Sequence, residues 1–327
     1  MKTADPNEPK LVEPQSTKPL TNRLKLSVLM LVYEHQEFVS QAISSVLSQV
    51  CDFQFELIII NDCSSDNSGE ICQDYAARHA DCIKYINNKT NLGMHASFSK
   101  LWSTSQADLV AFCEGDDYWL DDTKLQAQVD CLEKNSDWAL CGAKAQIVKR
   151  STDNTWLVAG ELKPPNLKPQ YRFDELIRSY CFHFSTVMLR KSAVVFPAWF
   201  DSVYCVDRPI YLLAAEHGQA GYLDKVVSAY RIHSGGNWST CSNSVKAKQS
   251  SDLFRKLAGH FDESYRVSFE LSLFDILQSY VAIEMQERRY ATARKLFVRA
   301  FGEVSFRNKF RCLRKHYRTA ALLLVKR

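Results

Sequence analysis

The sequence predicts an α/β protein with a mostly parallel, doubly wound sheet and a helical appendage towards its C-terminal end. Three observations support this class. Continuous apolar runs, which are typical of strands buried on both faces, alternate with amphipathic helical segments between residues 26 and 113. Each of these runs ends in a polar loop. After about Ser250, apolar residues recur at helical spacing and no further strand pattern follows.

The first four strands are short apolar runs with helices between them. The strands are expected over Leu26–Val32, Phe55–Ile60, Ile83–Ile86 and Leu109–Cys113. The helices are expected over residues 37–49, 68–79 and 96–105. Because such crossovers are right-handed, the sheet should be parallel, and its polar loops should meet outside the carboxyl ends of the strands. These loops are residues 33–36, 61–66, 91–95 and 114–119.

The rest of the chain continues this pattern less regularly. A helix is expected over residues 123–135, and two strands over 138–148 and 155–159 suggest a hairpin. Further strands are expected at 185–190 and 222–232, and further helices at 173–180, 209–216, 252–257, 265–287 and 290–301. The pattern divides the chain into a leader (1–22), an α/β domain (23–245) and a helical C-terminal region (246–327).

Composition and charge argue against several classes of protein. The 327 residues carry a net charge of +4, which is too small to indicate a nucleic-acid partner. The 11 cysteines are odd in number and form no CxxC pair, a pattern that favours buried thiols in a reducing compartment over disulfides or zinc. The leader is polar, holds four prolines and has the character of a disordered segment rather than a signal peptide. No apolar segment reaches the roughly 18 residues of a membrane span, so we expect a cytoplasmic protein.

The fourth strand runs directly into a cluster of carboxylates. Three acids, Glu114, Asp116 and Asp117, lie within four residues. Crowded carboxylates repel one another and resist desolvation, and a divalent cation such as Mg²⁺ or Mn²⁺ is the usual compensation. A solvated acidic turn, with Tyr118 and Trp119 as packing residues, accounts for the same pattern. The stretch alone leaves both interpretations open.

Six motifs in a fixed order carry a family resemblance. They are Ser-Val-Leu-Met-Leu-Val-Tyr-Glu-His (27–35), Asn-Asp-Cys-Ser-Ser-Asp-Asn-Ser (61–68), Asn-Leu-Gly (91–93), Cys-Glu-Gly-Asp-Asp-Tyr-Trp (113–119), Val-Asp-Arg-Pro (206–209) and Tyr-Arg-Ile-His-Ser-Gly-Gly-Asn-Trp-Ser (230–239). With them the stretch 25–239 resembles glycosyltransferase family 2, the inverting transferases of GT-A (nucleotide-diphospho-sugar transferase) fold, and within it the bacterial branch that decorates surface polysaccharides. The resemblance implies a Rossmann-like GT-A domain, a nucleotide-sugar donor, with a UDP-sugar expected, and a saccharide or lipid-linked saccharide acceptor.

The resemblance also implies which residues surround the donor. Six residues are expected at the nucleotide sugar: Tyr33, Glu34, Asp62, Asn91, Asp117 and Trp119. Tyr33 and its neighbours would line the pocket for the base, and Asp62 would accept a hydrogen bond from it, as in uracil recognition. Independently of the resemblance, Tyr118 and Trp119 are expected in the substrate cleft, because aromatic rings beside carboxylates often stack on sugars.

Sugar transfer needs two further groups. The departing diphosphate needs charge neutralisation, and the resemblance implies Mn²⁺ or Mg²⁺ on Asp116, with Glu114 in the place of the family's first acid. His233 lies where a late residue can reach the metal or the diphosphate. The attacking hydroxyl must lose a proton, and Asp207 matches the family's catalytic base. With one base and an in-line displacement, the anomeric centre inverts.

Each assignment has a purely structural alternative. Asp62 and Asp207 are natural caps for the helices that follow them. His233 could be an ordinary loop residue, and His183, between two phenylalanines, a core or cleft-lining residue. The chain departs from the usual residues of the family at three positions, which affects the expected base and acceptor preference: Glu34, Asn61 and Arg208.

Two other functions fit parts of the pattern. A nucleotidyltransferase also combines a parallel sheet with a metal, but it would carry a glycine-rich basic phosphate loop after the first strand, which residues 33–36 lack. A non-catalytic nucleotide-sugar or glycan-binding module would not need Asp62, Asp116 and Asp207 together. Neither GxGxxG nor GxxxxGK[ST] occurs, which argues against a dinucleotide dehydrogenase and a P-loop nucleotidase.

The C-terminal stretch 306–327 is strongly basic. It holds eight Lys or Arg residues and no acid, with apolar residues at helical spacing. A basic amphipathic helix of this kind can lie on the anionic inner face of a membrane, where a lipid-linked acceptor would be found. A final helix that packs on the body and leaves its basic face in solvent explains the pattern equally well.

Overall fold

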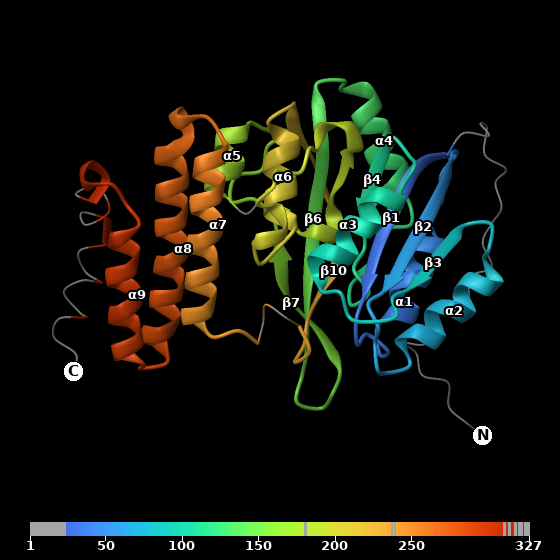
Figure 1. Cartoon of the computed structure of the whole chain (residues 1–327), viewed down its shortest axis with the longest axis horizontal. Coiled ribbons are helices and arrows are strands. Elements are labelled where there is room, and N and C mark those ends of the chain that lie inside the picture. Colours follow the sequence, from blue (N-terminus) through green and yellow to red (C-terminus); the bar gives the residue numbers. More distant parts are fainter. Residues whose placement is uncertain are drawn as a thin grey trace. The chain divides into compact units, whose positions relative to one another are not determined.

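The computed structural model describes residues 24–179, 182–236, 238, 240–309, 312, 315, 316, 319 and 323. The predicted leader and most of the basic stretch 306–327 lie outside these residues. The described residues belong to two compact units (Figure 1). The sheet unit contains the described residues up to 171 and those within 181–195 and 213–233, and the helical unit contains those within 172–180, 196–212 and from 234 onward.

The sheet unit is built on one mixed sheet. Its described strands are β1 (Leu24–Val32), β2 (Gln54–Asn61), β3 (Ile83–Asn87), β4 (Leu109–Phe112), β5 (Tyr118–Trp119), β6 (Trp138–Arg150), β7 (Trp156–Leu162), β8 (Gln170–Tyr171), β9 (Met188–Arg190) and β10 (Gln219–Ile232). The strand order is β3-β2-β1-β4-β9-β6-β10-β5, with β7 paired to β6 and β8 to β10. Strands β1, β2, β3, β4, β6 and β10 run in one direction, and the other four run against them. The expected mostly parallel sheet is confirmed, and so is the hairpin between β6 and β7.

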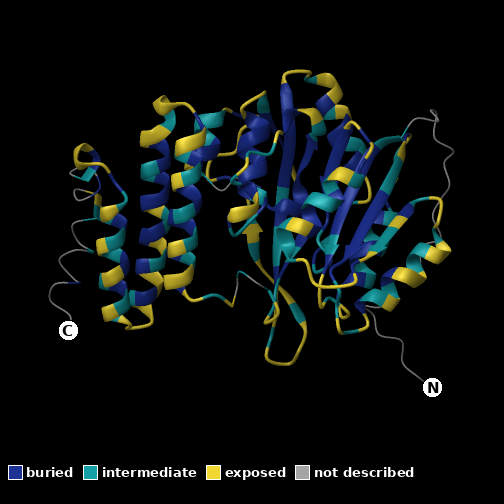
Figure 2. Cartoon of the chain, viewed as in Figure 1, coloured by how far each residue is buried: buried dark blue, intermediate teal, exposed yellow. Residues whose placement is uncertain are grey.

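Helices cover both faces of this sheet. They are α1 (Val39–Leu47), α2 (Ser68–Arg78), α3 (Met94–Thr104) and α4 (Lys124–Lys134). Alternate residues of β1, such as Val28 and Met30, join the core under α1, α2 and α4. Phe112 points to the other face, where its ring centroid lies 6.2 Å from that of Phe98 on α3. Figure 2 shows the strands as the most buried part of the unit and the outer turns of the helices as exposed.

Several predicted elements differ in part from the structure, two of them in the stretch 185–216. The strand expected at 185–190 begins only at Met188, because Thr186 N and Oγ1 both donate to the carbonyl oxygen of His183 and close a 3₁₀ turn. The helix expected from Pro209 is α6 (Asp207–Ala215), so Asp207 lies in the first helical turn instead of preceding the helix. Pro209 is tolerated there because the first amide groups of a helix need no intrahelical partner.

The helical unit contains α5 (Phe173–Arg178), α7 (Asn243–His260), α8 (Arg266–Gln286) and α9 (Tyr290–Gly302). Helix α8 contacts the other three. Helix α7 is longer than the predicted segment 252–257, because its polar first half, capped by the Ser242 hydroxyl, lacks an apolar period. None of the described helices combines the length and the apolar composition needed to span a membrane.

Candidate functional site at the carboxyl edge of the sheet

The loop after β1 is tied to the loop after β2. Glu34 Oε1 accepts hydrogen bonds from Ser65 N at 2.7 Å and Ser65 Oγ at 3.0 Å, and Glu34 N donates to Ser64 Oγ at 3.0 Å. Glu34 and Cys63 have φ angles of 58° and 61°, in the left-handed region that residues other than glycine rarely adopt. Such backbone strain persists where the surrounding contacts enforce it, and it is common at functional loops. Tyr33, beside this pair, is 44% exposed.

Asp62, which directly follows β2, organises the loop after β3. Its Oδ1 accepts hydrogen bonds from Asn88 Nδ2 at 2.8 Å, Leu92 N at 2.9 Å and Ser97 Oγ at 2.7 Å, and its Oδ2 accepts one from Gly93 N at 2.9 Å. Burial by itself would raise the pKa of Asp62, but these hydrogen bonds lower it below the ordinary value. The carboxylate therefore holds the loop on which Asn91 lies.

Asp116 is paired with the imidazole of a residue that follows β10. Asp116 Oδ2 lies 3.1 Å from Nε2 of His233, the residue that follows β10, and 3.7 Å from Nε2 of His35, which lies after β1. Burial alone would raise the pKa of Asp116, but the two histidines lower it well below its usual range. The predicted meeting of the loops after β1 and β4 is confirmed by this contact.

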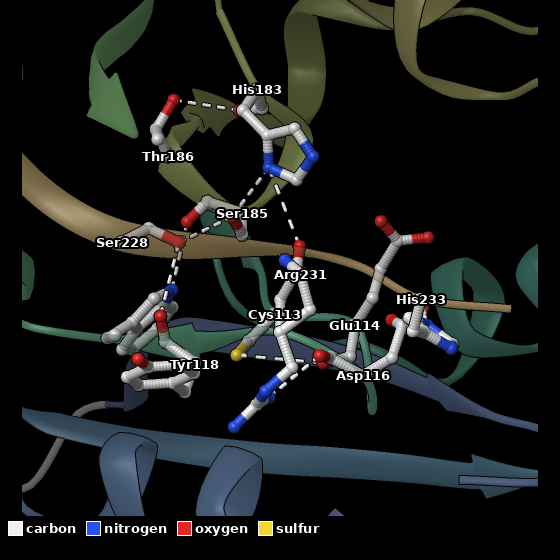
Figure 3. Close-up of polar contacts among 12 residues, drawn as sticks. Cys113, Glu114, Asp116, Tyr118, His183, Ser185, Thr186, Ser228, Arg231 and His233 are labelled. Atoms are coloured by element: carbon white, nitrogen blue, oxygen red, sulfur yellow. Dashed lines mark hydrogen bonds and ion pairs between the residues drawn. The ribbon is translucent and has the colours of Figure 1, made fainter. Parts of the chain in front are cut away.

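Asp117 points into the protein, away from the Asp116 pair. It is 1% exposed, and its Oδ1 accepts a hydrogen bond from Arg231 N at 3.0 Å. Its Oδ2 lies 3.5 Å from Nδ1 of His183. The same nitrogen shares a 2.8 Å hydrogen bond with Ser185 Oγ (Figure 3). Burial and then the neighbouring charge of Asp116 raise the pKa of Asp117 well above its ordinary value.

Arg231 joins the two adjacent acids to β10. Its Nη1 donates to the carbonyl oxygen of Asp116 at 2.7 Å, and its guanidinium lies 4.2 Å from the centroid of the Tyr118 ring. The residue is only 4% exposed, so the charge is satisfied inside the protein. Because His233 lies two residues further along the chain, the same contacts set the position of the imidazole next to Asp116.

The structure brings together some of the predicted residues and not others. The loops of Glu34, Asp62 and Asn91 are connected by the hydrogen bonds above. Trp119, which we expected to contact the sugar, is 5% exposed and packs in the core, where its Nε1 donates to the carbonyl oxygen of Ser185. Asp207 belongs to the helical unit, at the start of α6.

Sequence reasoning missed two residues of the site. His35 and Arg231 both stand inside the motifs that carry the resemblance, but neither was assigned a role. The spacing of Arg231 and His233 was the available signal, since residues two apart in an extended segment share a face. Nothing local indicates that His35 meets Asp116, because that contact depends on the order of β1 and β4 in the sheet.

The acid and imidazole pair has the donor chemistry for a divalent cation. Among the described residues, no group of three or more His, Cys, Asp or Glu side chains is arranged to hold a metal ion. Asp116 and His233 offer one oxygen and one nitrogen donor, a set that suits a cation whose other positions are taken by water or phosphate oxygens. Glu114 does not join them, since its side chain extends away from both in Figure 3. The pair fits the implied ion, and the third predicted donor does not.

Six strands in one direction, with an acid and imidazole pair at their carboxyl edge, agree with the GT-A class, the fold of nucleotide-diphospho-sugar transferases. The model of the family "Glycosyl transferase family 2" matches residues 27–195, and the chain belongs to this family.

Two curated relatives are similar to this chain, and one of them is named a putative glycosyltransferase. An uncharacterized protein of Mycobacterium tuberculosis is 27% identical over 216 residues, which cover 65% of this chain and 60% of that protein. The chain thus spans less than two thirds of the length of this relative. The putative glycosyltransferase EpsE of Bacillus subtilis is 25% identical over 291 residues, 88% of this chain and 92% of EpsE.

Solved structures share the fold. The structure of S. aureus TarS 1–349 in complex with UDP-GlcNAc has a TM-score of 0.58 at 15% identity and covers 91% of this chain and 92% of that one. The mannosyltransferase PcManGT from Pyrobaculum calidifontis, in complex with GDP-Man and Mn²⁺, has a TM-score of 0.58 at 15% identity and covers 98% of this chain and 85% of that one.

Proposed function

We propose that this chain transfers a sugar from a nucleotide diphosphate donor to a hydroxyl group of a saccharide acceptor, with inversion at the anomeric carbon. The observation that carries the proposal is the pairing of Asp116 with His233 at the carboxyl edge of the sheet. In open α/β sheets, ligands bind at this edge. Two proteins of the same fold, TarS and PcManGT, have been solved with UDP-GlcNAc and with GDP-Man and Mn²⁺. A UDP-sugar is the donor that we expect.

Asp116 and His233 would hold a Mn²⁺ or Mg²⁺ ion, and water or phosphate oxygens would take its other positions. Bound there, the ion would neutralise charge on the departing diphosphate. The carboxylate of Asp116 is well suited to this role because the neighbouring histidines keep its pKa low, so that it stays ionised at neutral pH. Arg231 would hold the Asp116 carboxylate and the His233 imidazole in position relative to each other.

The loops after β1, β2 and β3 would bind the nucleoside. Tyr33 and Glu34 would line the base pocket, with Asn91 near the nucleotide. For Asp62 the structure supports a role other than direct contact with the base, because its Oδ1 already accepts three hydrogen bonds from the chain. We propose that Asp62 acts on the base mainly by holding the loop 88–93 in place. Asp117 and Trp119 would support the site from inside the protein.

Asp207 would act as the base. The acceptor oxygen would form its bond to the anomeric carbon while the bond from that carbon to the diphosphate oxygen breaks, and the hydroxyl proton would pass to the Asp207 carboxylate. A single in-line displacement of this kind inverts the anomeric centre and needs no covalent intermediate. This assignment rests on the family resemblance of the Val206-Asp-Arg-Pro209 motif.

The acceptor would be a saccharide or a lipid-linked saccharide in polysaccharide, lipopolysaccharide or glycoconjugate synthesis. The relative EpsE is itself named a putative glycosyltransferase. The basic stretch 306–327 would bring the enzyme to the cytoplasmic face of a membrane on which a lipid-linked acceptor lies. The α/β domain (23–245) would carry the chemistry, and the helical region (246–327) would contribute to acceptor or membrane binding.

A nucleotide panel tests the proposal. Thermal unfolding of the purified chain would be recorded with UDP, GDP and a set of nucleotide sugars, each with Mn²⁺ and with EDTA. We expect a metal-dependent rise in Tm with UDP that is largest with one UDP-sugar. A well-folded sample that responds to no nucleotide diphosphate would contradict the proposal, and a response to GDP alone would contradict the expected base.

A further inference from the structure

We infer that His35 is a further donor-binding residue, which gives a hydrogen bond from Nε2 to a phosphate oxygen of the nucleotide diphosphate. The inference rests on the proposed function and deepens it. His35 Nε2 lies 3.7 Å from Asp116 Oδ2, whereas His233 Nε2 lies 3.1 Å from the same oxygen. The longer distance exceeds that of a hydrogen bond. Nε2 of His35 therefore faces the Asp116 site without being held by the carboxylate.

The backbone of His35 is firmly placed. Its N donates to Ser68 Oγ at 2.8 Å, and its carbonyl oxygen accepts hydrogen bonds from Phe38 N and Val39 N, both at 2.9 Å, at the start of α1. The side chain is 16% exposed. The backbone that carries the imidazole is thus fixed, and this limits the conformational entropy that would be lost when the ring binds a ligand.

The other ring nitrogen shows which role the imidazole can take. His35 Nδ1 is buried, and no described residue forms a hydrogen bond with it. A histidine that binds a metal through one nitrogen almost always donates the N–H of the other to an acceptor. Without such an acceptor at Nδ1, the tautomer with its proton on Nε2 is favoured, because it buries no unsatisfied N–H. His35 is therefore suited to donate a hydrogen bond and poorly suited to ligate the ion.

Gly115 provides the space for this ring. A Cβ atom at position 115 would lie 2.8 Å from His35 Nδ1 and 2.9 Å from Val32 Cγ2, closer than real Cβ atoms approach other groups. Only glycine therefore lets the carboxylate cluster come this close to the imidazole. Gly115 is thus needed because it has no side chain, and not because of its backbone conformation.

The chemistry of the site identifies the ligand group. If Asp116 and His233 hold a divalent cation, phosphate oxygens of the donor would be bound beside it, and one of them would lie within reach of a hydrogen-bond donor that faces the same carboxylate oxygen. An anionic diphosphate beside the Asp116 carboxylate needs hydrogen-bond donors there. His35 supplies such a donor from the loop after β1.

Four variants and two binding measurements test this role. Mn²⁺ affinity of the nucleotide-free protein would be measured by electron paramagnetic resonance, and UDP and UMP affinity at saturating Mn²⁺ by titration calorimetry. The variants are His35→Phe, His35→Gln, His35→Asn and, as an exposed control, His217→Gln. We expect His35→Phe to bind Mn²⁺ like the wild type but UDP roughly 10- to 100-fold more weakly, with a smaller loss for UMP. His35→Gln should retain most of the UDP affinity, because its amide nitrogen can take the place of Nε2.

The outcomes separate the inference from the function on which it rests. Equal UDP affinity in His35→Phe and the wild type would overturn the inference, and so would a loss of Mn²⁺ affinity, which would make His35 a ligand or a support of Asp116. Should His35→Phe fail to fold, His35→Asn and His35→Gln decide between the outcomes. The shorter amide of Asn takes the place of Nδ1 and not of Nε2, so His35→Asn should bind UDP more weakly than His35→Gln. Equal UDP affinities of these two variants would overturn the inference. A wild type that binds no nucleotide diphosphate would instead remove the proposed function and the inference with it.

Discussion

His233 Nε2 lies 3.1 Å from Asp116 Oδ2, although the two residues are 117 positions apart in the chain. The contact exists because β10 pairs with β5, the short strand that directly follows Asp116 and Asp117. Arg231 strengthens this arrangement from the same strand by donating to the Asp116 carbonyl oxygen. The pair is therefore a property of the sheet, and it would be lost if β10 took another position.

Asp116→Asn tests the metal-binding role of the pair. Because an amide is a poor ligand for a divalent cation, we expect the Mn²⁺-dependent stabilisation by UDP to disappear and sugar transfer to fall about 10²- to 10³-fold. Asp130→Asn, an exposed substitution on α4, is the matched control and should leave both unchanged. Thermal unfolding with Mn²⁺ or EDTA and a transfer assay provide the measurements. An Asp116→Asn variant with normal Mn²⁺ dependence would refute the assignment.

Asp207→Asn tests the base. Removal of the base should lower kcat about 10²- to 10⁴-fold, while the Kd for UDP in the presence of Mn²⁺ stays within about twofold of the wild type. Asp201→Asn changes an exposed acid of the neighbouring 3₁₀ turn η3 (Phe200–Ser202) and serves as the control. Steady-state kinetics combined with calorimetry would separate the two effects. Unchanged transfer by Asp207→Asn would show that another group accepts the proton.

Asp62→Asn tests the buried anchor of the loop 88–93. Asparagine cannot accept the same four hydrogen bonds, so at pH 7 we expect a loss of roughly 1–3 kcal/mol in the free energy of unfolding. The folded-state pKa of Asp62 lies below its unfolded value of about 3.9, so the advantage of the wild type is complete above that value. It should shrink as the pH falls through the lower folded-state pKa. Urea unfolding at neutral and acidic pH checks this. The same difference at all pH values would contradict it, and Asp81→Asn is the exposed control.

Lys124→Met tests how a buried amine beside Trp119 affects stability. Lys124 is fully buried, its Nζ has no hydrogen-bond partner among the described residues, and it lies 4.1 Å from the centroid of the Trp119 ring. Burial lowers the pKa of Lys124 to about 7. Below that pH, Lys124 is charged in both the folded and the unfolded protein, and the folded state bears the full free-energy cost of burying the charge. Between about pH 7 and 10.4 the amine is neutral in the folded protein but still charged in the unfolded one, so the free-energy cost falls as the pH rises.

We therefore expect Lys124→Met to be more stable than the wild type by about 1–4 kcal/mol at pH 6, with a smaller difference at pH 10. Lys134→Met, at the exposed end of the same helix, should change stability little at either pH. Urea unfolding at the two pH values provides the test. An advantage of Lys124→Met that is the same at pH 6 and pH 10 would show that the amine binds protons equally in the folded and unfolded protein, so that burial does not lower its pKa.

Local patterns in the sequence predicted much of this architecture. The apolar runs that became β1 to β4 and the helical periods between them were found within two residues of their ends, because period and polarity are properties of neighbouring residues. The two-residue strands β5 and β8 were not predicted, since a pairing of that length leaves no periodic signal. The strand predicted at 185–190 includes two residues of the turn at 184–186, because apolar content does not reveal the hydrogen bonds from Thr186 to His183.

The sequence by itself determined the family, the class of sheet and the edge at which polar loops gather. Tertiary structure decided which polar residues meet: it paired Asp116 with His233, turned Asp117 and Trp119 inward, surrounded Asp62 with donors and placed His35 against Gly115. The physical reason is that strand order and side-chain direction depend on pairings between distant segments, whose energies are settled only when the whole sheet packs.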